Sequence, residues 1–212
     1  MRLCMFHPEG HPLERGWVGR IDDSQVTHLA AQTLQSFFLG GGAAREHALY
    51  PLDGVALLAP VLHPPAVRIF EREHEFAFAN PAAILSPGST AERPGGADAV
   101  EALVRPAAVI GAEGRPGGWT ILGELRAPDV APPKDRDFAL FLGPWVETDF
   151  VAQSHHGSSS FDWDTALDRA AANTQLRAGD LVAAPPVQRT ELDAGPFELA
   201  VDGLGALHGR LR

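Results

Sequence analysis

Cysteine and lysine are almost absent from this sequence. Cys4 is the single cysteine among 212 residues, which excludes an intrachain disulfide and a metal site built from several cysteines. Sixteen of the 17 basic residues are arginine, and the single lysine is Lys134. Only lysine offers an amine whose pKa burial can tune. Lys134 is therefore either a leftover of an arginine-biased composition or an amine kept for a specific site.

Positive charge and long apolar runs are also scarce. The 17 basic residues face 27 acidic ones, a net charge of −10, which disfavours binding to nucleic acid phosphates. The longest apolar stretch, residues 54–67, is interrupted by His63 and three prolines and is shorter than the ~20 residues of a membrane helix. The N-terminus reaches His7 too early for a signal peptide. We expect a cytoplasmic protein with neither nucleic acid nor a membrane as partner.

Glycine and proline, by contrast, are abundant. The chain has 22 glycines and 18 prolines, which together are about a fifth of its residues, compared with about 12% in average proteins. Such a composition favours short strands joined by turns. Hydrophobic residues make up 45% and charged residues 21%, which is typical of a folded globular chain. We predict a mostly β protein of the α+β class with two or three helices.

The apolar patterns divide the chain near residue 54. Residues 1–54 predict a small N-terminal β-rich domain with one helix over residues 27–39, and residues 55–212 a larger β domain. The clear later helix is residues 162–173, with Trp163, Ala166, Leu167 and Ala170 on one face. The predicted strands are residues 2–6, 16–21, 55–61, 76–85, 100–110, 119–122, 138–146, 181–184 and 197–211.

Six motifs in the second part follow one another in the order of a known family. In this order they resemble the catalytic domain of the fumarylacetoacetate hydrolase family over about residues 55–212. The resemblance implies a mixed β-roll domain behind a small β-rich N-terminal domain, and usually a homodimer. The motifs are residues 58–68, Asn-Pro-Ala-Ala-Ile at 80–84, Ala-Ala-Val-Ile-Gly at 107–111, the Lys134 to Thr148 segment with Leu-Gly-Pro-Trp, Leu176 to Asp180, and Val201 to Leu207.

The resemblance also implies a metal centre that this sequence does not complete. The family's chemistry is hydrolytic cleavage of a C–C bond in β-diketo acids, or decarboxylation or isomerisation in some relatives. A divalent cation, usually Mg²⁺, holds the substrate oxygens and stabilises the enolate. Its four carboxylate positions fall at Ile69, Leu103, Arg105 and Glu124, of which only Glu124 is acidic. We therefore predict no metal cofactor here. Arg105 or an ordered water would take the space, with Glu124 paired to Arg105 or to a backbone donor.

Two groups of catalytic candidates remain. In the family a His-Glu pair activates water, because the carboxylate orients an imidazole that takes a proton near neutral pH. Here His74 is the candidate base, with Glu73 as its partner, although it lies two residues short of the family spacing. Lys134 and Asp137 match the catalytic-lysine loop. The catalytic candidates are thus His74, Glu73, Lys134 and Asp137, and the substrate-binding candidates are Arg105, Glu124 and Lys134. The alternatives without a catalytic role are a solvated charged face at residues 71–75 and a salt-linked loop at residues 134–137.

Two functions stay open from the sequence. In the first, the chain is an enzyme with altered chemistry: Lys134 binds an anionic oxygen of a small organic acid, His74 acts as base, and Arg105 replaces the charge of the metal. In the second, the chain is a catalytically inactive family member that keeps the fold as a small-acid-binding or structural dimer.

The adjacent histidines His155 and His156 are a further candidate for metal binding. Neighbouring residues on a strand point to opposite faces. The Gly-Ser-Ser-Ser run that follows favours a loop, so we expect no metal site there.

Overall fold

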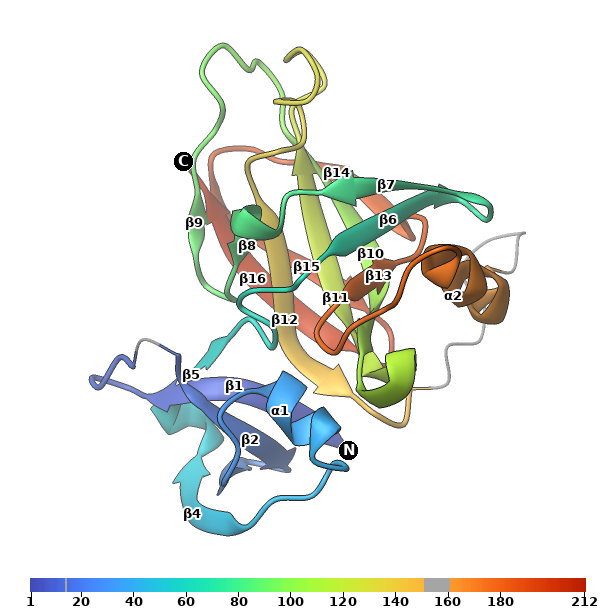
Figure 1. Ribbon diagram of the computed structural model, residues 1–212. Helices are drawn as coiled ribbons and strands as arrows, with labels where there is room; N and C mark the ends of the chain where they lie inside the picture. The colour runs from blue at the N-terminus through green and yellow to red at the C-terminus, as the bar shows by residue number, and fades with distance from the viewer. Residues whose placement is uncertain (14, 151–160) are drawn as a thin grey trace.

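A computed structural model describes residues 1–13, 15–150 and 161–212. The predicted mostly β, α+β class is confirmed. A 13-stranded sheet and a three-stranded sheet account for the strands of these residues, which also include two α-helices (Figure 1). Neither helix is long and apolar enough to cross a membrane. His155 and His156 lie outside the described residues.

The N-terminal part is a set of antiparallel strands with one short helix. The helix predicted over residues 27–39 was wrong for its first part. Thr27 lies in a strand and pairs with Arg20 on one side and Leu49 on the other. The helix starts only after Thr33, whose side chain accepts a hydrogen bond from the Ser36 amide. The elements are β1 (Arg2–Pro8), β2 (Trp17–Asp22), β3 (Gln25–Leu29), α1 (Leu34–Leu39) and β4 (Glu46–Pro51).

Three long antiparallel strands form the centre of the large sheet. They are β10 (Glu101–Ile110), β11 (Pro116–Arg126) and β12 (Leu140–Glu147). The strand order is β4-β3-β2-β1-β12-β11-β10-β13-β6-β7, so the N-terminal strands join the sheet through β1 and β12. The strands beyond β10 are β13 (Leu181–Ala183), β6 (Val67–Arg72) and β7 (Glu75–Ala79), and β14 (Gln188–Glu191) also pairs with β10.

The remaining strands attach to this frame. A 3₁₀ turn, Leu52–Gly54, lies at the predicted domain boundary and leads into β5, which pairs with β1 of the N-terminal part. The division at residues 54 and 55 stays a prediction. The other strands are β5 (Val55–Leu58) on β1, β8 (Ile84–Leu85) on β12, and a separate sheet of β15 (Gly195–Val201), β16 (Gly205–Leu211) and β9 (Thr90–Ala91).

The predicted second helix is confirmed as α2 (Trp163–Ala171). Asp162 caps it by accepting hydrogen bonds from the amides of the first turn. Ala166 and Ala170 are buried against Phe70 of β6 and neighbouring strands. A loop over residues 172–180 then returns the chain to the sheet.

Strand register brings the four predicted metal-ligand positions to one face of the sheet. Residues directly opposite each other on paired strands share a face. Leu103 on β10 lies opposite Glu124 on β11, and Arg105 follows Leu103 two residues later on the same side. Ile69 joins this face through the row Ile69–Ala183–Ala107. The site positions inferred from the motifs are therefore neighbours in space.

Candidate functional site

Arg105 lies at the centre of this face and is completely buried, with 0% of its surface exposed. Its Nε donates to Glu124 Oε2 at 3.0 Å, and its Nη2 lies 2.9 Å from the same oxygen. Its Nη1 donates to the carbonyl oxygens of Phe70 at 2.9 Å and Ala184 at 3.0 Å. The predicted pairing of Glu124 with Arg105 is confirmed.

Two more arginines and one more glutamate complete a charged network. Glu124 Oε1 accepts from Arg126 Nε at 3.0 Å and lies 2.8 Å from Arg136 Nη2. Glu71 lies 3.3 Å from Arg105 Nη2 and 3.3 Å from Arg136 Nη2, and it also contacts Arg126. We call these five residues the Arg–Glu cluster. Three guanidinium groups face two carboxylates, which leaves a net charge of +1.

The cluster is buried at one end and reaches the surface at the other. Arg105 and Glu124 are fully buried, whereas the side chains of Glu71, Arg126 and Arg136 are 34%, 20% and 22% exposed. Glu71 lies near the end of β6, and Arg126 ends β11. Arg136 comes from the following loop, which is closed by a hydrogen bond from the Ala127 amide to the Asp135 carbonyl.

The cluster shifts the pKa values of its members. Burial on its own raises the pKa of Glu71, but the charge of Arg105 and the hydrogen bond from Arg126 outweigh it, so the pKa lies below its ordinary value. Burial lowers the pKa of Arg105, against the opposing effect of Glu124 and Glu71. The guanidinium remains charged at physiological pH.

The lowered pKa of Glu71 predicts a dependence of stability on pH. A carboxylate whose pKa is lower in the folded than in the unfolded state stabilises the fold above the unfolded value, here 4.5, and this contribution is lost as pH falls through the folded value. We expect Glu71→Gln to lower the free energy of unfolding at pH 7 by about 1 kcal/mol, since the group is partly exposed. The stability of the variant should also fall less steeply below pH 4.5 than that of the parent.

The measurement is urea unfolding, followed by tryptophan fluorescence, at a series of pH values. Glu73→Gln is the matched control, because Glu73 is two residues away and contacts only the exposed His74 among the described residues. If the free energy of unfolding falls equally steeply below pH 4.5 in the two variants, the role of Glu71 in the cluster is contradicted.

The residues at the predicted metal position do not fit a divalent cation. Ile69 and Leu103 are apolar and fully buried, and both oxygens of Glu124 are already paired with arginines. A Mg²⁺ ion needs about six oxygen ligands, with carboxylates to offset its charge. Across residues 1–13, 15–150 and 161–212, no three His, Cys, Asp or Glu side chains are grouped so as to hold a metal ion.

Lys134 and Asp137 form an ion pair that is not part of the cluster. Lys134 is 74% exposed, and its Nζ donates to Asp137 Oδ2 at 2.5 Å. Asn80 Nδ2 donates to the other oxygen of Asp137 at 2.7 Å. Both bonds lower the pKa of Asp137, and the bond from Lys134 has the larger effect. This geometry is that of the salt-linked loop, and the side chain that this loop sends into the cluster is Arg136.

His74 and Glu73 lie at the turn between β6 and β7. The His74 side chain is 76% exposed and its Nε2 is 4.0 Å from Glu73 Oε2. His74 and Glu73 thus match the solvated charged face of the alternative interpretation, whereas Glu71 of the same run pairs with the arginines of the cluster. The structure brings together Arg105 and Glu124 of the predicted site residues, but it joins neither His74 nor Lys134 to them through any described contact.

Sequence reasoning missed Arg126 and Arg136, which pair with Glu71 and Glu124. It named Glu71 only as one of three neighbouring carboxylates, with Glu73 and Glu101, of which Arg105 would neutralise one. Two signals were available for these partners. Glu124 and Arg126 are two residues apart on one strand and so share a face. An arginine inside the apolar strand β10 requires a buried counter-charge from neighbouring strands.

Comparisons with known proteins give matches among solved structures alone. Neither a family model nor a curated protein matches the sequence. The fold is that of 5-carboxymethyl-2-hydroxymuconate delta-isomerase from Mycobacterium smegmatis, with a TM-score of 0.78 and 20% identity over 100% of this chain and 99% of that chain. Maleylpyruvate hydrolase from Sphingobium sp. SYK-6, in complex with manganese(II) and pyruvate, gives a TM-score of 0.76. The sequence identity is 18%, and the match covers 100% of this chain and 98% of that chain.

Fumarylacetoacetate hydrolase from Exiguobacterium antarcticum gives a TM-score of 0.78 and 17% identity, over 100% of this chain and 99% of that chain. The class of structure is thus settled: the chain has the fumarylacetoacetate hydrolase fold along its whole length. The resemblance drawn from the motifs is confirmed at the level of the fold.

Proposed function

We propose that this chain is a divergent fumarylacetoacetate hydrolase family protein whose metal centre is replaced by the Arg–Glu cluster. The observation that carries the proposal is the fully buried ion pair of Arg105 with Glu124, at two of the positions where the family resemblance places metal ligands. A cation there would have to displace a guanidinium that is bound to Glu124 and to two backbone carbonyls. Metal-dependent C–C bond cleavage is therefore not the function of this chain.

The role that remains is that of a non-catalytic protein which binds a small organic acid or serves as a structural dimer. The net positive charge of the Arg–Glu cluster and the partial exposure of Arg126 and Arg136 favour a carboxylate ligand at its outer edge. A metal-independent enzyme would need a general base within reach of that edge. The candidate base His74 is exposed, and within the described part of the chain its one ion-pair partner is Glu73, which favours the non-catalytic role.

The test is calorimetric titration with Mg²⁺ and Mn²⁺, followed by oxalate and pyruvate, together with an assay for cleavage of maleylpyruvate in the presence of Mn²⁺. We expect no metal binding at millimolar concentration and no cleavage, and any binding of oxalate to be independent of metal. Glu124→Ala is the control variant. Metal binding that this substitution abolishes, or cleavage that needs Mn²⁺, would overturn the proposal and restore ordinary hydrolysis as the function.

We also propose that the chain forms a homodimer, since its family resemblance implies one. The expected result of light scattering at micromolar concentration is a mass near twice the 22.6 kDa of one chain. A strict monomer over the concentration series would contradict the structural-dimer role and leave acid binding to be tested alone.

A further inference from the structure

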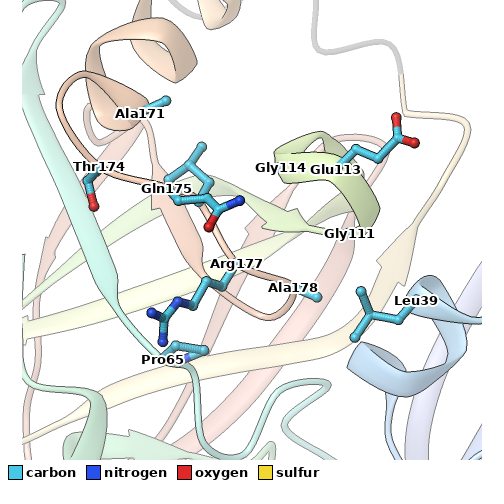
Figure 2. A pocket seen from close by; sticks show the side chains of 11 residues that line it. Leu39, Pro65, Gly111, Glu113, Gly114, Ala171, Thr174, Gln175, Arg177 and Ala178 are labelled. Carbon is cyan, nitrogen blue, oxygen red and sulfur yellow. The ribbon is translucent and has the colours of Figure 1, made fainter.

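A cavity of about 590 Å³ lies where the end of α2 meets the loop over residues 172–180 (Figure 2). It adjoins a hollow of about 220 Å³ that shares Pro65, Thr174, Gln175 and Arg177 with it. Ligand sites typically have volumes of about 300–1,000 Å³. None of the lining residues belongs to the Arg–Glu cluster, so this is a separate site.

The cavity has a polar end and an apolar end. In Figure 2, Thr174, Gln175, Arg177 and Pro65 lie on one side, and Leu39 lies across the cavity beyond Ala178. Glu113, an acidic residue that also lines the cavity, stands apart from Arg177, and its carboxylate points away from it (Figure 2). A ligand with a polar head and an apolar body matches this division.

The polar end holds a buried arginine with an unused donor. Arg68 lines the adjoining hollow and only 6% of its side chain is exposed. Its Nη1 donates to Asp180 Oδ2 at 3.0 Å, but its Nε has no hydrogen-bond partner within the described residues. Buried polar groups are normally paired, and the Oδ1 of Asp180 is also without a partner among the described residues. Because the Nε of Arg68 is closed off from solvent, Arg68 contributes its positive charge to this end of the cavity and no direct hydrogen bond through Nε.

The charge at this end is positive. Arg68 and Arg177 face the single carboxylate of Asp180, which leaves a net charge of +1. The Asp180 Oδ2 atom also accepts from the Arg177 amide at 3.1 Å, and the Arg177 side chain lies beside Pro65 (Figure 2). Gly179, with φ 89°, makes this turn, and a Cβ there would meet Gln35 at 2.6 Å.

We propose that this cavity binds a monocarboxylate with a short aliphatic chain. The carboxylate would accept hydrogen bonds from Arg177, Thr174 and Gln175 near the Arg68 guanidinium. The aliphatic chain would lie toward Ala178 and Leu39. Leu39 is 66% exposed, and the chain would cover its side chain. The proposal goes beyond the function proposed above and is independent of it, because the two sites share no residue.

The first test is a chain-length series measured by calorimetry and by NMR on the labelled protein, with acetate, butyrate, hexanoate and octanoate as probes. We expect the dissociation constant to fall by up to about fourfold for each methylene group that becomes buried, and to reach about 1 mM or below for octanoate. Octanol should bind at least tenfold more weakly than octanoate. The perturbed amides should be those of residues 174–178.

The second test uses two exposed residues whose replacement leaves the fold intact. Arg177→Ala should weaken octanoate binding at least tenfold, and Arg189→Ala, an exposed arginine outside the cavity, is the matched control and should not. Leu39→Asp should remove the gain in affinity with increasing chain length, while the affinity for acetate stays unchanged.

Equal octanoate affinity in the parent and in Arg177→Ala would overturn the proposal, as would unperturbed amides at residues 174–178. Octanol binding as tightly as octanoate would show a purely apolar pocket and overturn it too. Loss of oxalate binding at the Arg–Glu cluster would not affect any of these results, so the two proposals fail separately.

Discussion

Replacement of Arg105 by methionine is expected to lower the free energy of unfolding by about 3–5 kcal/mol, because it leaves Glu124 buried without its central partner. Glu124 and Arg105 are both fully buried, so water cannot replace the lost hydrogen bonds. Two backbone carbonyls, of Phe70 and Ala184, also lose their donor. Urea unfolding followed by tryptophan fluorescence measures the change.

The double variant Arg105→Met/Glu124→Leu separates the burial of a charge from simple loss of packing. A buried ion pair can often be exchanged for apolar side chains of similar size at little cost in stability. We therefore expect the double variant to be more stable than Arg105→Met alone. Arg189→Met, in an exposed pair with Glu101, should change the stability by less than about 1 kcal/mol. A double variant less stable than the single one would show that the pair contributes net stability.

Placing carboxylates at the positions where the motif resemblance puts metal ligands should create a metal site. In the triple variant Ile69→Asp/Leu103→Glu/Arg105→Glu, three new acidic groups share one sheet face with Glu124. Without metal, their repulsion and burial should destabilise the fold strongly. Mn²⁺ at about a hundred times its dissociation constant contributes about 2.7 kcal/mol. We expect this to raise the melting temperature by about 5–10 °C, while that of the parent stays constant.

Thermal unfolding with and without Mn²⁺ provides the measurement. The neutral triple variant Ile69→Asn/Leu103→Gln/Arg105→Gln has nearly the same shape without the charges, and its melting temperature should not respond to Mn²⁺. A folded acidic variant with the same melting temperature in both conditions would show that these four positions do not converge on one ion.

Much of the fold was predictable from local patterns. Alternating apolar residues and dense glycine and proline predicted the long strands, and Asp162 marked the start of α2. The helix over residues 27–39 failed in its first part, because Thr27 is held by strands on both sides. Hydrogen bonds to two neighbouring strands outweigh a helical spacing of apolar residues, and this pairing is not visible in the local sequence.

The candidate site was likewise predicted in part from the sequence and decided in part by the tertiary structure. The motif resemblance predicted that three of the four ligand positions carry no carboxylate, and that Glu124 would pair with Arg105 or with a backbone donor. It singled out Lys134 and gave no role to Arg136, which is two residues further along the same loop. The course of that loop sends Arg136 to Glu124 and leaves Lys134 in solvent. Strand register, a long-range property, brought Glu71 of β6 to the buried Arg105 of β10, because a charge inside a sheet is paired by whichever strands lie beside it.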